Sequence, residues 1–205
     1  VGPPEQRAIA DSLVDALRVE LRAHPDFRVT TSRQWLARWP LRGPALVIRG
    51  RVAVTNGDVS VQLSQAAMSE VTAPLGSWRT LRDSLTYRVM LAVWDTLSPL
   101  ARSLPRGALP HTSLGLARFL HAEQLVAAGE WGNAYRAYAE AESTDPTCWL
   151  CSWRLSDVER WLGREHDPAR LQRVRDHIDA FPPWYQNLIR AADLPLPEGL
   201  ELLHT

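Results

Sequence analysis

Lysine is absent from this 205-residue chain: its 23 basic residues are all arginine, and 23 acidic residues balance them. A formal net charge of zero removes the global attraction on which binding of nucleic acid or of an anionic membrane surface depends. No apolar run approaches the roughly 20 residues of a membrane-spanning helix, and no signal peptide is recognisable. The first residue is Val1 rather than methionine, which indicates a processed product or a fragment.

Tryptophan, by contrast, is abundant, with nine residues, and 45% of the chain is hydrophobic. This content is normal for a chain that folds around a core, and the length suffices for one compact domain or two small ones. Trp149, Trp153 and Trp161 recur at helical spacing. This stripe favours packing in a core over exposure as interface anchors.

The first half of the sequence predicts a mixture of helices and strands. Apolar residues recur at helical spacing over residues 8–23, which predicts a helix. A short strand is expected at residues 27–30. A short helix is expected at residues 31–39, because Pro40 disfavours its continuation.

A β-hairpin is the clearest strand signal. Apolar and polar residues alternate over residues 46–54 and again over 59–63. Asn56-Gly57 lies between the two runs and supplies the positive φ angles of a tight turn. A long helix with an apolar face follows over residues 78–97.

The second half of the sequence contains helical signals throughout. The chain therefore divides into a small α/β domain at residues 1–98, a linker at 99–112, and helices over 113–205. The linker holds three prolines and a glycine, which fits a rigid corner between two units. Together these parts predict the α+β fold class.

A repeat of about 34 residues marks the helical half. Gly129 ends one helix and Trp131 opens the next, and the small Ala134 lies where two helices approach closely. Three pairs of similar residues are one period apart: Gly129 and Gly163, Phe119 and Trp153, and Asp145 and Asp179. The pattern predicts two consecutive helix hairpins.

The second copy of the repeat is less regular than the first. Pro168 takes the place of Ala134, and Arg175 takes the place of Ala141. A further helix at about 184–192 is expected to close the stack. Because a helical solenoid needs about three units or caps, we expect it to pack against the α/β half.

The order of these elements resembles a bacterial arrangement in which a domain related to the amino-terminal domain of TolB precedes tetratricopeptide repeats. Such regions are the non-kinase parts of bacterial serine/threonine kinases and related regulators. The matching stretches are residues 10–13, 27–29 and 46–63, and, in the repeats, 119–123, Gly129-Glu130-Trp131 and Phe181-Pro182-Pro183. The family's first strand is absent, and residues 69–72 lack its glycine-aromatic pattern.

The resemblance implies a non-catalytic sensing or docking module, commonly outside the cytoplasmic membrane. It does not imply a kinase, because the chain has no glycine-rich phosphate loop, catalytic-loop motif or magnesium-binding motif.

The phase of the repeat predicts which side chains contact a partner. The first helices of the two repeats are expected to present an apolar centre and a charged rim on a concave face. These residues are Leu116, Phe119, Glu123 and Val126 in the first repeat and Leu150, Trp153, Asp157 and Arg160 in the second. We expect Phe119→Ala or Trp153→Ala to weaken partner binding without unfolding the protein.

Cys148 and Cys151 form the one chemically suggestive motif. They lie at the expected start of a helix, where the helix dipole lowers a thiol pKa. Position 152 is serine, which excludes a covalent haem site. Zinc would need two further ligands, and a thioredoxin-like site would need a strand directly before the motif. A local disulfide and a pair of packed thiols remain as the main alternatives.

The other polar residues predict no chemistry. Asp157 and Glu159, beside Arg154 and Arg160, are expected to form a solvated helix face with local ion pairs. The six histidines are isolated, and no nucleophile-base pair or phosphate loop stands out. We therefore expect no catalytic residue, cofactor or metal.

A non-catalytic binding scaffold is the function that these patterns favour. The expected partners are protein subunits of a larger bacterial membrane-associated complex, or a missing kinase region, with no nucleic acid. The expected location is periplasmic and peripheral to the membrane, with the cytoplasm as the alternative. The alternative functions are a thiol-disulfide redox protein that uses Cys148 and Cys151, or a small-ligand sensor in the α/β half.

Overall fold

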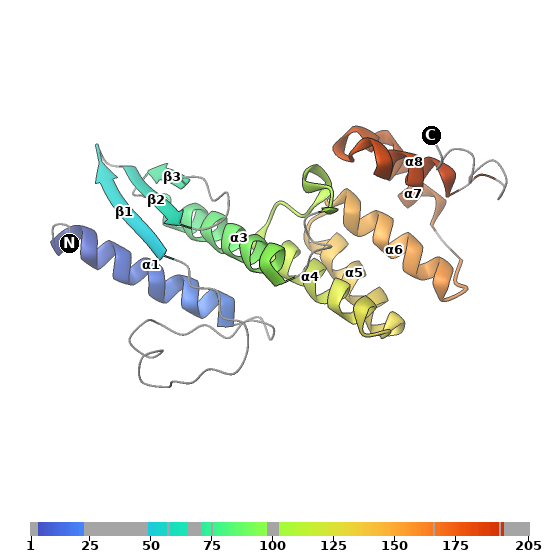
Figure 1. Ribbon diagram of the computed structural model, residues 1–205, viewed down its shortest axis with the longest axis horizontal. Coiled ribbons are helices and arrows are strands. Elements are labelled where there is room, and N and C mark those ends of the chain that lie inside the picture. The colour runs from blue at the N-terminus through green and yellow to red at the C-terminus, as the bar shows by residue number, and fades with distance from the viewer. Residues whose placement is uncertain are drawn as a thin grey trace. The chain divides into compact units, whose positions relative to one another are not determined.

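The computed structural model describes residues 4–22, 49–56, 58–64, 71–74, 76–97, 103–165, 167–192 and 194. The chain forms two compact units, Val1–Arg102 and Ser103–Thr205. Helices predominate, and the first unit adds a small three-stranded antiparallel sheet (Figure 1). The predicted α+β class is confirmed at this level. The strand and helix predicted over 27–39 lie outside the described residues.

Two helices account for most of the described residues of the first unit. α1 (Pro4–Arg22) and α3 (Trp78–Leu97) contact each other, and α3 has the bounds that the sequence predicts. The apolar faces meet in a core that contains Leu13, Leu21, Leu81, Leu85, Val89 and Met90. At the edge of this contact Arg82 pairs with Glu20 at 3.1 Å.

The sheet of the first unit has the order β1-β2-β3. β1 (Arg49–Thr55) and β2 (Asp58–Ser64) form the predicted hairpin, and Asn56 adopts the expected positive φ of 53° in its turn. β3 (Val71–Pro74) pairs antiparallel with β2 and was not predicted, although its alternate side chains are buried. Residues 46–48 of the predicted first strand lie outside the described residues.

The second unit is a succession of helices. They are η2 (Arg106–Ala108), α4 (Ser113–Ala127), α5 (Trp131–Thr144), α6 (Trp149–Trp161), α7 (Pro168–Asp176), η3 (Ile178–Ala180) and α8 (Pro183–Ala191). α4 contacts α5, α5 contacts α6, and α6 contacts α7 (Figure 1). Short connections and contacts between neighbours in sequence produce two consecutive helix hairpins, α4–α5 and α6–α7. Residues 103–112 of the expected linker belong to this unit.

Glycine ends the first helix of each hairpin in the same way. Gly129 and Gly163 follow α4 and α6 with φ angles of 76° and 63°, a conformation that other residues rarely adopt. The next amide then returns to the helix: the Glu130 N–H donates to the Leu125 carbonyl, and the Arg164 N–H to the Glu159 carbonyl. The two turns are 34 residues apart, as the sequence predicts.

The second hairpin departs from the predicted period after its glycine. Residues 128–130 connect α4 to α5, whereas residues 162–167 connect α6 to α7. Pro168 therefore opens α7, with the Asp167 side chain accepting from the Ala169 N–H at its start. Counted from the helix starts, Leu171, not Pro168, corresponds to Ala134. The second copy therefore has a leucine where the first has a small alanine, and it is less regular than the first in either alignment.

Within the described ranges, no helix combines the length and the apolar character that crossing a membrane requires.

Candidate protein-interaction surface

The apolar residues predicted to face a partner lie in the core of the second unit. Leu116, Phe119 and Leu150 are fully buried, and Trp153 is 2% exposed. The Phe119 ring packs against the Tyr138 ring of α5, with centroids 5.9 Å apart. The structure therefore corrects the prediction for these four side chains: the apolar stripe of each first helix packs inside the helix stack. Phe119→Ala and Trp153→Ala are core substitutions.

The polar residues predicted for the same face remain partly accessible. The side chains of Glu123 and Asp157 are 14% and 13% exposed, and that of Arg160 is 48% exposed. Val126, at the end of α4, is half-buried. The predicted face thus contributes polar groups rather than an apolar centre.

Glu123 is the centre of a polar cluster that joins three helices. Its Oε1 lies 3.0 Å from Arg154 Nε of α6, and its Oε2 accepts from a terminal Arg154 nitrogen at 3.4 Å. The Tyr138 hydroxyl of α5 donates to the same carboxylate. A half-buried charge pair with an added hydroxyl donor fixes the relative positions of α4, α5 and α6.

Burial determines the ionisation of this cluster. Burial and the neighbouring Glu123 carboxylate raise the pKa of the Tyr138 hydroxyl above its usual range, so it remains a donor. For Arg154, burial opposes the charge, but the Glu123 carboxylate outweighs burial and raises the guanidinium pKa. Tyr185 of α8 lies in the same field, and burial raises its pKa to about 12.

Asp157 is the exceptional member of the cluster. Burial raises its carboxyl pKa to about 6, against the opposing effect of Arg154 and Arg160. Arg160 Nη1 lies 3.5 Å from Asp157 Oδ1, a long distance for an ion pair. The carboxylate is therefore buried without full compensation of its charge, which is why its pKa is raised.

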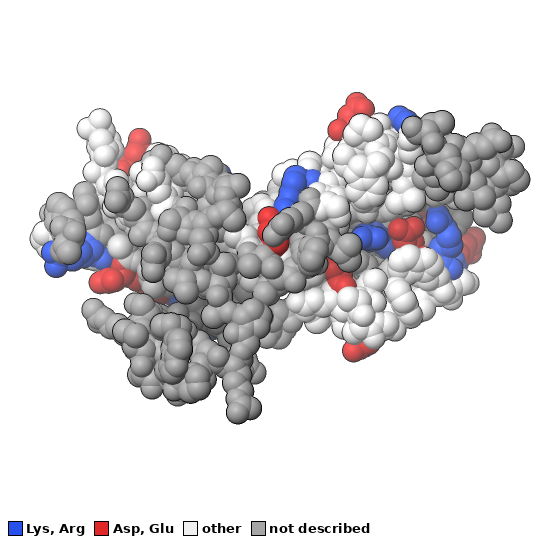
Figure 2. Space-filling view, in the orientation of Figure 1, with Lys and Arg blue, Asp and Glu red and all other residues white. Residues whose placement is uncertain are grey.

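A second network lies between α5, α6 and α7. Glu142 Oε2 is 3.4 Å from Arg170 Nε and Glu159 Oε2 is 2.7 Å from Arg170 Nη1. The Ser152 hydroxyl donates to Glu142 Oε1 at 2.6 Å, and Arg173 Nη2 lies 3.6 Å from the same oxygen. Glu159 was predicted to lie on a solvated helix face, but it is only 4% exposed. Its ion-pair partner, Arg170, belongs to α7 and not to α6. Charges of both signs lie side by side on this unit in Figure 2.

Asp145 connects the chain before α4 to the turn between α5 and α6. Its carboxylate accepts from the backbone N–H groups of His111, Thr112 and Thr147, and from the Thr147 hydroxyl. Burial would raise the pKa of this carboxyl, but the hydrogen bonds outweigh burial and lower it. The sequence marked Asp145 as the end of a repeat; its role as an acceptor for a segment 34 residues away depends on the folded arrangement.

Cys148 and Cys151 are joined by a disulfide at the start of α6, with Cα atoms 5.2 Å apart. Cys148 is also the N-cap of the helix, and its sulfur accepts from the Cys151 N–H. Both residues are fully buried. A dithiol that exchanges with substrates is partly exposed, so this position suits a structural bridge.

Exposed aromatic side chains gather where α5 begins and α6 ends. Trp131 and Trp161 are 38% and 53% exposed and meet edge to face, with ring centroids 4.9 Å apart. Close to them in sequence, the Arg164 guanidinium lies 4.3 Å above the centre of the Tyr135 ring. We call these four residues the aromatic-arginine surface. Tryptophan, tyrosine and arginine are the residues most enriched at the energetic centres of protein interfaces.

The sequence assigned Trp161 to the core, together with Trp149 and Trp153. Of these three, only Trp153 is buried; Trp149 is half-buried and stacks on His177, with ring centroids 3.8 Å apart. Trp161 lies in the last turn of α6, where it is exposed. Helical spacing alone cannot identify where a stripe passes out of the core.

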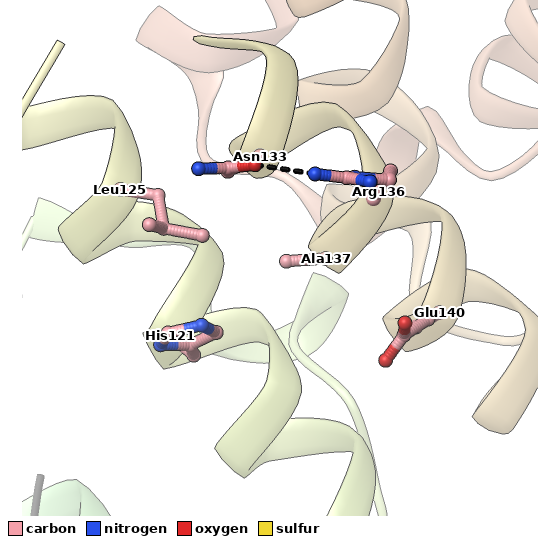
Figure 3. A pocket seen from close by; sticks show the side chains of 6 residues that line it. All are labelled: His121, Leu125, Asn133, Arg136, Ala137 and Glu140. Carbon is pink, nitrogen blue, oxygen red and sulfur yellow. Dashed lines mark hydrogen bonds between the residues drawn. The ribbon is translucent and has the colours of Figure 1, made fainter. Parts of the chain in front are cut away.

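A shallow groove of about 260 Å³ lies between α4 and α5. Figure 3 shows that four of its six lining side chains are polar, with Arg136 donating to Asn133 at 2.6 Å. The lining residues are His121, Leu125, Asn133, Arg136, Ala137 and Glu140. This volume falls below that of typical small-molecule pockets, and the polar lining fits a hydrated surface.

No protein-family model, curated protein or solved structure matches this chain.

Proposed function

We propose that this chain is a non-catalytic scaffold whose C-terminal unit is a tetratricopeptide-like repeat stack that binds another protein. The observation that carries the proposal is the repeated hairpin, with left-handed glycines 34 residues apart at Gly129 and Gly163. Helix-hairpin stacks present extended rigid surfaces to other polypeptides. The buried polar networks hold α4 to α7 in one arrangement, as a preorganised binding surface requires.

The aromatic-arginine surface is the proposed contact site. It replaces the buried part of the predicted concave face as the expected point of contact with a partner. Trp131 and Trp161 already contact each other, so little side-chain entropy is lost when a partner covers them. Rigid aromatic anchors with adjacent arginines form the centre of many interfaces.

The proposed setting is a bacterial membrane-associated assembly outside the cytoplasm, in which this chain is an accessory or sensory subunit with a TolB-like α/β unit. The buried disulfide supports an oxidising compartment, because such bridges persist in the periplasm and are rare in the cytosol.

The test is co-purification of the tagged chain from its native membranes, followed by measurement of affinity for the protein recovered. We expect Trp131→Ala with Trp161→Ala to weaken binding by about thirtyfold or more. The matched control is Leu114→Ala, because Leu114 is 49% exposed on α4 and is equally apolar. Equal affinity of the double variant and the control, with both folded, would refute the assigned surface.

A further inference from the structure

The segment that precedes α4 crosses the end of the helix stack at which both hairpin-to-hairpin turns lie. A turn at residues 145–148 follows α5, and η3 follows α7. Because consecutive helices of the hairpins alternate in direction, these two connections lie at the same end of the stack. η2 contacts η3, although the two are far apart in the sequence (Figure 1). We call residues 105–112 the strap.

Hydrogen bonds hold the strap at the first of these turns. The N–H groups of His111 and Thr112 donate to Asp145 Oδ2, at 2.5 and 3.2 Å. The His111 ring nitrogen Nδ1 lies 3.1 Å from Thr147 Oγ1, and this hydroxyl donates to the Asp145 carboxylate. Hydrogen bonds to a carboxylate are stronger than those to a neutral acceptor, so this end of the strap is firmly held.

Close backbone packing holds the strap at the second turn. Gly107 lies so near Ala180 that a Cβ atom at position 107 would be 2.9 Å from the Ala180 carbonyl oxygen. This distance is too short for a carbon atom beside a backbone oxygen, so glycine is required where the two segments approach. Gly107 is exposed, so the restriction comes from this approach and not from a crowded core.

The strap between its two anchors is short and stiff. Residues 107 and 111 are four residues apart, which limits the distance between them to about 14 Å. Ala108, Leu109 and Pro110 are buried, and the proline ring restricts φ. In a simple helical stack each unit contacts its neighbours only. The strap adds a tie that restrains the distance between the two turns.

We propose that the strap sets the angle between the two helix hairpins and thereby keeps the aromatic-arginine surface in its binding conformation. This inference rests on the proposed function, because it concerns the same contact site. Trp131 begins α5 and Trp161 ends α6, so their contact joins the hairpins at the end of the stack opposite to the strap. The two hairpins are thus tied together at both ends.

A small rotation between the hairpins is enough to break the aromatic contact. α5 has 14 residues, which span about 21 Å. A rotation of about 10° at the strapped end moves the other end of such a helix by roughly 3.5 Å. The ring centroids of Trp131 and Trp161 are 4.9 Å apart, and aromatic contacts are favourable only to about 7 Å. Release of the strap therefore separates the two rings, and a partner must then order them again.

Hydrogen exchange of the full chain tests the tie without a partner. In Gly107→Ala the added methyl group should force the strap away from Ala180. We expect the amides of Ala180 and Phe181, which donate within the η3 turn, to exchange about tenfold faster. Because the strap is one stiff segment, the amides of His111 and Thr112 at the other turn should also exchange faster.

Gly76→Ala is the matched control for this substitution. Among the described residues, no atom beyond the chain neighbours lies within 4 Å of a Cβ atom placed at position 76, and this glycine belongs to the first unit. The control should leave hydrogen exchange in the second unit unchanged. Unchanged exchange in Gly107→Ala, or faster exchange at Ala180 and Phe181 alone, would overturn the proposal.

A variant at the other anchor keeps the test decisive if Gly107→Ala does not fold. Asp145→Ala removes the acceptor that holds His111 and Thr112. If the strap couples the two turns, the amide of Ala180 should exchange faster in this variant as well. Faster exchange that is confined to the turn at residues 145–148 and to the strap would show that the anchors are independent, which overturns the proposal.

Affinity for the protein recovered from native membranes tests the effect on the contact site. We expect Gly107→Ala to weaken binding by about tenfold, although the strap contributes no residue to the aromatic-arginine surface, and Gly76→Ala to leave binding unchanged. If the Trp131 and Trp161 double variant weakens binding and Gly107→Ala does not, the proposed function stands and the inference about the strap fails. If the double variant binds normally, the contact site is refuted and its control by the strap is refuted with it.

Discussion

Asp157→Asn is expected to stabilise the protein at neutral pH. Burial raises the pKa of Asp157 from its ordinary value of 3.8 to about 6, so at neutral pH the folded state must hold an ionised carboxylate that it disfavours. Because one pKa unit corresponds to about 1.4 kcal/mol, the cost reaches about 3 kcal/mol. The attraction to Arg154 and Arg160, which the variant loses, is already contained in that pKa.

The direction of the expected stability change follows from the ionisation of Asp157 in the folded and unfolded states. Below pH 3.8 the carboxyl is protonated in both states and contributes nothing to the dependence. Between pH 3.8 and about 6 the folded state binds more protons than the unfolded state, so stability falls as pH rises. Above about pH 6 the difference is constant. The asparagine side chain of the variant does not titrate, so the advantage of the variant should appear across this window.

Urea unfolding of wild type and Asp157→Asn at several pH values between about 4 and about 8 measures this difference directly. We expect similar stabilities near the acidic end and a gain of about 1–3 kcal/mol for the variant at neutral pH. Asp145→Asn is the matched control, because hydrogen bonds outweigh burial and lower the pKa of Asp145. That variant should lose stability to a similar extent across this pH range, because the pKa of Asp145 is lowered from 3.8 and the loss shrinks only below that pH. An Asp157→Asn variant that is less stable at every pH would refute the reasoning.

The remaining predictions concern the core and the disulfide. Phe119→Ala and Trp153→Ala should each lower the free energy of unfolding by about 3–5 kcal/mol, measured in urea, because both rings are buried. Normal stability of these variants together with weaker partner binding would instead indicate that the two rings contact the partner. Replacement of Cys148 and Cys151 by serine should cost about 1–2 kcal/mol in a thermal melt, because the bridge closes a short loop. Unchanged stability together with catalytic turnover of a small disulfide by the native protein would support the redox alternative.

Local patterns predicted the elements that depend on neighbouring residues. The bounds of α3 follow from its apolar periodicity, and the β1–β2 hairpin follows from alternation around Asn56. β3 was missed because a strand of four residues contains too little alternation to stand out, and it depends on pairing with Val61 and its neighbours in β2. Short strands are specified by their partners.

Burial and pairing between helices were harder to predict. The sequence placed Leu116 and Leu150 on a helix stripe correctly but could not show that neighbouring helices cover that stripe. Glu159 and Arg170 pair across α6 and α7, although the sequence offered closer partners on one helix. The aromatic-arginine surface depends on the end of α6 meeting the start of α5, which only the fold establishes.

Site-specific photo-crosslinking in the native cell tests the central claim most directly. A photoreactive side chain in place of Trp161 should join the chain covalently to one defined partner polypeptide, because that ring lies in the proposed contact site. The same group at Leu114, which is similarly exposed on α4, should give no such product. Absence of a product from position 161, or the same products from both positions, would contradict a scaffold that binds through the aromatic-arginine surface.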